Sequence, residues 1–202
     1  MISIETFTEI RKRFGHFASW AVWAEEGKNP KDNIDDLTVL DPVRNPLLLK
    51  TLHGDSILLG LNISRGIECP LGNFHDPRPM ATDFKIRYAL KDTICWGSYM
   101  TDIIKDFEEK ASGKMMSFLR GNKEFEQDNI RKLREEIEVL GFTSPVLVTF
   151  GKDAEIITKR NLDKEFQVVC IPHYASYISK EDYRVQVCAQ LQELSANKNK
   201  AG

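Results

Sequence analysis

Short apolar runs separated by helix-like segments constrain the fold of this chain more than any other feature. Four runs bounded by turn residues have the length and composition of buried strands, at residues 56–62, 93–99, 145–151 and 166–171. Helical patterns follow them, with helices expected at about 81–91, 128–140, 153–159 and 180–194. Strands that alternate with helices form βαβ units with right-handed crossovers. The pattern therefore predicts an α/β protein, a three-layer α/β/α domain with a central, mainly parallel four-stranded sheet.

The rest of the chain is expected to cover this sheet or to form loops. Residues 4–24 carry apolar side chains at helical spacing, and a short helix is expected at 47–53, so the N-terminal region is predicted to be a helical wrapping. Residues 63–79 are rich in Gly, Pro, Asn and His, as in a long functional loop. Residues 103–124 are compatible with a helix or with an excursion. We expect one domain over residues 1–195 and a disordered tail over 196–202.

Composition places the chain among ordinary globular proteins. Its 202 residues are 42% hydrophobic and 29% charged, which suits a single core. The sequence contains no run of 18 apolar residues, and its N-terminus lacks a basic segment followed by an apolar one. We therefore expect a cytoplasmic monomer with no membrane partner.

The cysteines give no indication of a metal or cofactor. Cys69, Cys95, Cys170 and Cys188 are far apart, form no C-x-x-C pair and have no histidine at metal-ligand spacing. Zinc sites and iron–sulfur clusters need closely spaced ligands. We expect reduced cysteines, no metal and no cofactor.

The net charge of −2 and the pI near 6.1 provide no overall attraction to the phosphates of nucleic acid. Binding to DNA would need a local basic patch. Solvated surface charge is the interpretation we favour for either of the two candidate groups taken alone. The first group is Arg65, Arg78, Lys85, Arg87 and Lys91, and the second is Lys110, Lys114, Arg120 and Lys123.

Three segments should meet at one edge of the predicted sheet. Ligands of open parallel sheets bind outside the carboxyl ends of the strands. Residues 62–66, 101–102 and 173–176 each follow an expected strand. We therefore expect Asn62, Asp102 and His173 to line one pocket.

These segments also resemble, in order and position, the motifs of the uracil-DNA glycosylase superfamily. The motifs are GLNISRG at 60–66, MTDIIK at 100–105 and IPHYAS at 171–176, and the resemblance spans about residues 56–178. Phe150-Gly151 with Ala154 is similar to the Gly-x-x-Ala helix entry of that family. The chain departs from the family pattern at three places. Ile63 stands in place of Pro, Asp102 in place of the frequent Asn, and Tyr174-Ala175 in place of Pro-Ser.

The resemblance implies a DNA glycosylase, a hydrolase that removes a damaged or deaminated base in base excision repair. The base would first be flipped out of the duplex. Asn62 and His173 resemble the catalytic residues, Asn62 placing the attacking water and His173 donating a hydrogen bond to a base oxygen. Phe74, Asp102 and Ile63 would bind the base, with Phe74 as the stacking ring. The residues implied to contact DNA are Arg65, Tyr174, Ser176 and Tyr177, with Tyr177 chosen as the side chain that fills the gap left by the base.

Asp102 leaves the identity of the base open. An ionised carboxylate only accepts hydrogen bonds, whereas an amide both donates and accepts. Asp102 would then favour a base edge rich in N–H groups, or would need a raised pKa. The sequence therefore does not identify uracil as the substrate.

Structural roles compete with each of these assignments. Asn62 could cap a turn, His173 could be a buried histidine, Phe74 could be a core ring, and Asp102 could cap a helix beginning at Ile103. Tyr177 could pack against the C-terminal helix. Two alternative functions remain open: a catalytically inactive nucleic-acid-binding module of the same fold, and an α/β enzyme acting on a small free ligand.

Overall fold

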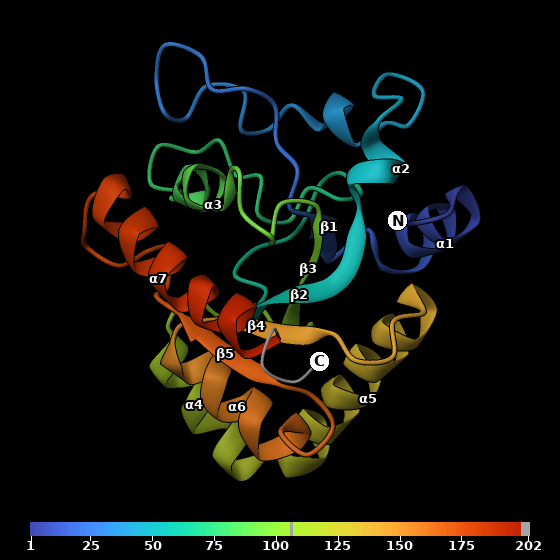
Figure 1. Cartoon of the computed structure of the whole chain (residues 1–202). Coiled ribbons are helices and arrows are strands. Elements are labelled where there is room, and N and C mark those ends of the chain that lie inside the picture. Colours follow the sequence, from blue (N-terminus) through green and yellow to red (C-terminus); the bar gives the residue numbers. More distant parts are fainter. Residues whose placement is uncertain (106, 199–202) are drawn as a thin grey trace.

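The fold is α/β, with a central sheet between two layers of helices (Figure 1). The computed structural model describes residues 1–105 and 107–198. The sheet has the order β1-β3-β2-β4-β5; β2 to β5 are parallel, and β1 runs antiparallel to β3. The predicted three-layer architecture is confirmed, but the sheet has five strands rather than four. The strands are β1 (Ala18–Trp20), β2 (His53–Asn62), β3 (Ser98–Ile104), β4 (Val146–Phe150) and β5 (Val168–Ile171).

Two separate apolar cores hold the layers together. One core joins the sheet to α1, α4, α5 and α6, and the other joins its opposite face to α3 and α7, which lie side by side in Figure 1. A 3-10 helix at Leu37–Leu40 precedes α2. The helices are α1 (Ile4–Phe14), α2 (Leu48–Thr51), α3 (Asp83–Leu90), α4 (Ser112–Gly121), α5 (Lys123–Leu140), α6 (Lys152–Leu162) and α7 (Lys180–Lys198).

The fifth strand comes from the segment that was expected to be one N-terminal helix. Ser3 caps α1 by accepting a hydrogen bond from the Thr6 backbone N–H at 3.1 Å, and the helix ends at Phe14. The chain then turns, and Ala18–Trp20 pairs with β3. All three of these residues are buried, and a fully buried strand has no period that distinguishes it from a helix. The prediction of a single helix over 4–24 was therefore wrong.

The strand expected at 93–99 lies about five residues later, at Ser98–Ile104. Residues 93–97 form a turn that ends at Gly97, whose φ is +89°. A Cβ on Gly97 would collide with the Thr51 carbonyl oxygen, so only glycine fits there. Asp102 therefore lies inside β3 rather than after it, and it does not cap a helix.

Residues that the sequence left ambiguous are now assigned. In the segment 103–124, β3 ends at Ile104 and α4 spans Ser112–Gly121, and α5 begins at Lys123, before the expected residue 128. Helix α7 extends to Lys198, past the expected end at 194, and residues 199–202 of the expected tail lie outside the described residues. Within the described chain, no helix is both long enough and apolar enough to cross a membrane.

Candidate functional site

A cavity of about 790 Å³ opens at the carboxyl end of the parallel strands. The structure brings Asn62, Asp102 and His173 together here, since all three line this cavity. Asn62 is the last residue of β2, Asp102 lies within β3, and His173 follows β5 by two residues. More of the wall comes from the loop before α3, residues 109–112, the end of β4 and the first turn of α6.

Asp102 is held against Gly60, its partner across the β2–β3 ladder. A Cβ on Gly60 would lie well inside contact distance of Asp102 Oδ1 and 3.3 Å from Phe74 Cζ. The other carboxyl oxygen, Oδ2, accepts a hydrogen bond from Asn73 Nδ2 at 2.7 Å. Asp102 is 4% exposed, and burial raises its pKa to about 7, against the lowering effects of Asn73 and Lys105. The absence of a side chain at Gly60 thus makes room for a carboxyl group with one oxygen bound and one unbound.

Asn73, which sequence reasoning missed, fixes this carboxyl. Its Nδ2 also donates to the Phe17 carbonyl at 2.8 Å, and its Oδ1 accepts the Phe74 backbone N–H at 3.0 Å. Every polar group of the Asn73 amide therefore has a partner that sets its orientation. Its position beside Phe74 was the only sequence signal.

The amide of Asn62 is oriented by the chain that follows β3. Its Nδ2 donates to the carbonyls of Ile63 at 2.9 Å and of Glu109 at 2.7 Å. Both amide hydrogens are thus engaged, and Oδ1 is the atom that remains to accept a hydrogen bond. Asn62 is half-buried, as a residue at the wall of a cavity should be.

The hydrogen bonding of His173 specifies its tautomer. Nδ1 accepts the Ala175 backbone N–H at 3.0 Å, so the proton of the neutral ring is on Nε2. Desolvation by the surrounding protein lowers the His173 pKa, and Asp153 opposes this effect. Gly151, with φ of +86°, lets the ring approach, because a Cβ there would lie 3.1 Å from His173 Cβ. The site therefore presents a neutral imidazole with an N–H donor.

An aromatic cluster forms the base of the site. Phe150 and Tyr174 line the cavity, with ring centroids 5.3 Å apart, and His173 stacks on Tyr174 at 4.4 Å. Phe74, the predicted stacking ring, lies behind Phe150 at 5.9 Å and is 3% exposed. It is not among the residues that line the cavity. Phe150 is itself 1% exposed, so the half-buried Tyr174 is the ring that a ligand could reach.

Ile63 and Arg65 occupy structural positions. Ile63 is 7% exposed and belongs to the apolar core that includes Leu61, away from the cavity wall. Arg65 forms an ion pair with Asp76 at 3.3 Å and donates to the carbonyls of Gly66 and Gly72. The guanidinium of Arg65 therefore holds the 65–76 loop together.

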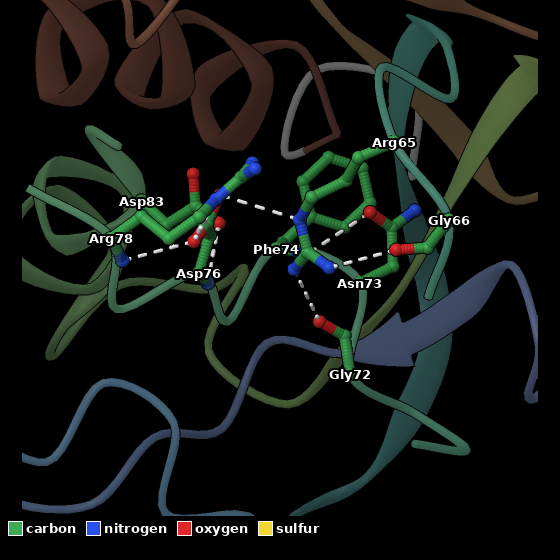
Figure 2. A network of polar contacts seen from close by, with 8 residues as sticks. All are labelled: Arg65, Gly66, Gly72, Asn73, Phe74, Asp76, Arg78 and Asp83. Atoms are coloured by element: carbon green, nitrogen blue, oxygen red, sulfur yellow. Dashed lines mark hydrogen bonds and ion pairs between the residues drawn. The ribbon is translucent and has the colours of Figure 1, made fainter. Parts of the chain in front are cut away.

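A second buried carboxyl, which the sequence did not reveal, belongs to the network in Figure 2. The figure shows the guanidinium groups of Arg65 and Arg78 at the Asp76 carboxylate. The Asp76 backbone N–H donates to Asp83 Oδ2 at 2.9 Å. Burial raises the pKa of Asp83 to about 6. Asp76, Arg78 and Asp83 all line the same cavity as Asn62.

A buried lysine positions the loop that carries His173. Lys85 Nζ donates to the backbone carbonyls of Ser176 at 2.9 Å and Ile178 at 2.8 Å, and Lys85 is 8% exposed. Ser176 is half-buried, and its N–H donates to the His173 carbonyl. Tyr177 is fully exposed, which contradicts the alternative that it packs against the C-terminal helix.

The two candidate basic groups differ in how their charges are used. Lys91 pairs with Glu25, and Arg87 donates to three backbone carbonyls, so with Arg65, Arg78 and Lys85 the whole first group is engaged. In the second group Lys123 pairs with Glu126. Lys110, Lys114 and Arg120 are exposed and make no ion pair within the described part of the chain.

Five acidic residues and three basic ones line the cavity. The acidic residues are Asp76, Asp83, Asp102, Glu109 and Asp153, and the basic ones are Arg78, Lys110 and Lys152. None of the four cysteines is in a disulfide, and Cys95, expected in a strand, lies in the turn before β3. Among the described residues, no group of three or more His, Cys, Asp or Glu side chains is placed to hold a metal ion.

Comparisons of this chain with models of protein families, with curated proteins and with solved structures gave no match. No family is assigned to it. The functional argument therefore depends on the geometry of the cavity.

Proposed function

We propose that this protein hydrolyses the bond between a base and deoxyribose in DNA, as a glycosylase of base excision repair. One observation carries the proposal: Asn62, Asp102 and His173, which come from three parallel strands, line one cavity. Each presents a different chemical group, respectively a carbonyl oxygen, a carboxyl oxygen and an N–H donor. The carbonyl oxygen and the N–H donor are the groups that the chemistry of base removal requires, and the carboxyl oxygen can contact the edge of a base.

Asn62 and His173 divide the reaction between its two ends. Asn62 Oδ1 accepts a hydrogen bond from a water molecule and holds it near the sugar carbon that loses the base. The water oxygen forms the new C–O bond, the C–N bond breaks, and its electron pair leaves with the base. His173 Nε2–H donates to a base oxygen on which negative charge develops. The water gives up a proton to the solvent, and the departing base takes one.

The cavity supplies an apolar face for the flipped base. Unstacking a base costs a few kcal/mol, which stacking on a protein ring offsets. Tyr174 lines the cavity, packs against the buried Phe150 and takes the stacking role first expected of Phe74. Asp102 contacts the edge of the base.

Contacts to the DNA strand come from exposed residues around the opening. Tyr177 projects from the loop after His173 and would enter the gap that the base leaves. Lys110 lines the cavity and Lys114 follows it on α4; both are exposed and could neutralise phosphates. These interactions would position the strand with its flipped base in the cavity.

A second candidate function is supported by the charge of the cavity. Five carboxyl groups against three cations disfavour a phosphate backbone and suit a small free ligand such as a nucleoside. The same three residues could then hydrolyse the bond between a free base and its sugar. A mixture of free nucleosides, analysed for released base, distinguishes this candidate from the first.

The first candidate is tested with single- and double-stranded oligonucleotides that carry uracil, hypoxanthine, xanthine or mismatches. Abasic sites are revealed by alkaline cleavage. We expect abasic sites in at least one substrate, and none when His173 is replaced by Ala. Abasic sites formed equally by the His173→Ala protein would show that the activity does not come from this cavity.

A further inference from the structure

Asp102 presents a single oxygen to the cavity. Asn73 binds Oδ2 at 2.7 Å, while Oδ1 lies over the bare Cα of Gly60 and accepts no hydrogen bond from the described residues. We propose that this one oxygen selects the class of base that the protein excises: as a protonated hydroxyl it binds an oxo base, and as an ionised oxygen it binds an amino base. The inference depends on the glycosylase function proposed above.

The partners of Asn73 explain why the two oxygens of Asp102 are not equivalent. Asn73 Oδ1 already accepts the Phe74 N–H, and Asn73 Nδ2 also donates to the Phe17 carbonyl. Rotating the Asn73 amide would lose both bonds, so Nδ2 always faces Asp102. Oδ2 of Asp102 is therefore a permanent acceptor, and a proton on this carboxyl resides on Oδ1.

The charged groups around Asp102 keep both protonation states accessible. Lys105, directly after β3, pairs with Glu136 on α5 at 2.8 Å, and it also donates to the Asp102 backbone carbonyl, so its charge is largely compensated. Asp83 on α3 and the half-buried Tyr174 complete the surroundings. Burial raises the pKa of Asp102, the Asn73 hydrogen bond and Lys105 lower it, and Glu136 and Asp83 raise it further, with a result of about 7. Near neutral pH the carboxyl is thus neither fully ionised nor fully protonated.

The two states recognise different base edges. Uracil and hypoxanthine present a carbonyl oxygen, which needs a donor, whereas cytosine and adenine present an amino group in the equivalent place, which needs an acceptor. A protonated Oδ1 donates and an ionised Oδ1 accepts. A site with an asparagine at this position would lack the second state.

The test compares wild-type protein with Asp102→Asn. In this variant the amide oxygen accepts from Asn73, and the amide NH₂ takes the place of Oδ1 as a donor that does not titrate. Single-turnover excision of uracil and hypoxanthine, and of cytosine and adenine, is measured from pH 6 to 8.5 for both proteins. Dividing the two rates at each pH cancels the titration of His173 and of the DNA.

On the oxo bases, we expect the ratio of wild-type to variant rates to fall roughly thirtyfold from pH 6 to 8.5, because the protonated fraction of an acid falls about tenfold for each pH unit above its pKa. On the amino bases the ratio should rise. Asp83→Asn is the matched control, since it neutralises the other buried carboxyl of the cavity. The ratio of its rate to that of the double variant Asp102→Asn/Asp83→Asn should still fall with pH on the oxo bases.

A wild-type-to-variant ratio on oxo bases that is constant with pH would overturn this inference while leaving the glycosylase function intact. If the fall with pH disappeared between Asp83→Asn and the double variant, Asp83 rather than Asp102 would select the base. That result would also overturn the inference. If wild-type protein excised no base at any pH, both the proposed function and the inference would be wrong. Thermal melting of each variant confirms that it is folded.

Discussion

Gly60 is a residue whose lack of a side chain shapes the site. A Cβ at this position would overlap Asp102 Oδ1, while Asn73 holds the same carboxyl through Oδ2. In Gly60→Ala the carboxyl must move or lose its hydrogen bond. We expect excision to fall by at least about tenfold, since about 1.4 kcal/mol of lost binding to the transition state is tenfold in rate. The rate and the melting temperature are measured together. A wild-type rate in Gly60→Ala would contradict this account of the Asp102 position.

The ring of Tyr177 is proposed to enter the gap that the flipped base leaves in the duplex. Its side chain is fully exposed, so its replacement by Ala should leave the melting temperature unchanged. Stacking of a base on an aromatic ring contributes about 1–3 kcal/mol. Tyr177→Ala should therefore weaken excision from duplex DNA much more than from single strands. Lowered thermal stability with an unchanged ratio of duplex to single-strand activity would remove Tyr177 from the DNA-binding surface.

Single residues were predictable where one strand end sufficed to place them. Asn62 and His173 lie beside strand ends that the sequence marks with apolar runs, so their meeting at one cavity was expected. The role of Phe74 depends on Phe150, which is distant in the chain, and that of Arg65 depends on how the 65–76 loop folds back to bring Asp76 to it. No local pattern encodes such contacts.

At the scale of elements, β3 is fixed to α5 by a buried ion pair. Lys105 and Glu136 lie 2.8 Å apart with side chains 1% and 0% exposed, and the Tyr99 hydroxyl donates to Glu136 at 2.6 Å. Removing one partner of such a pair leaves a buried charge without compensation, which costs about 3–5 kcal/mol. Glu136→Leu should therefore lower the free energy of unfolding by about that amount, measured by urea denaturation.

The double variant Lys105→Met/Glu136→Leu is the control for this pair. It removes both charges and should recover most of the lost stability, because no buried charge remains. A double variant that is as unstable as Glu136→Leu would mean that packing rather than charge accounts for the loss.

Elements were predicted well where their boundaries carry turn residues. The strand at 56–62 and the helix that ends at Gly141 were placed from such signals. The strand at 98–104 was placed too early because the apolar residues of the turn before it, including Cys95 and Trp96, read as strand. Strand β1 was missed because its stability comes from pairing with β3, where Ala18 lies opposite Thr101. No local pattern signals a pairing so distant in the sequence.

For the whole molecule, the buried carboxyls couple folding to pH. Burial raises the pKa of Asp102 from 3.8 to about 7 and that of Asp83 from 3.8 to about 6. The folded protein therefore holds more protons than the unfolded chain in this range. The stability contributed by the neutral carboxyls is fully present below pH 3.8 and is lost as the pH rises to about 7.

Asp102→Asn isolates this effect, because its amide does not ionise. Relative to wild type, the variant should gain stability as the pH rises from about 4 to 7, by an amount on the order of a few kcal/mol, and the difference should be constant above that range. Burial lowers the pKa of His75 to about 4, so His75 destabilises both proteins equally in acid. Urea denaturation at several pH values measures the difference. A difference that does not vary with pH would mean that the pKa of Asp102 is the same in the folded and unfolded states.

The overall architecture followed from the alternation of strands and helices, since parallel strands need helical crossovers on both faces. The order β3-β2-β4-β5 then brings the ends of three predicted strands to one cavity. The N-terminal region could not be placed by this rule, because it adds an antiparallel edge strand and loops rather than a βαβ unit.

In the proposed function, the cavity binds a base and Asn62 places the water that removes it. Single-turnover excision and DNA affinity are measured together for wild type, for Asn62→Ala and for Asn45→Ala, an asparagine outside the cavity wall. We expect Asn62→Ala to lose at least about a hundredfold in turnover with nearly unchanged affinity, and Asn45→Ala to match wild type. Equal losses of turnover and affinity in Asn62→Ala would contradict the account and leave Asn62 with its structural bonds to Ile63 and Glu109 alone.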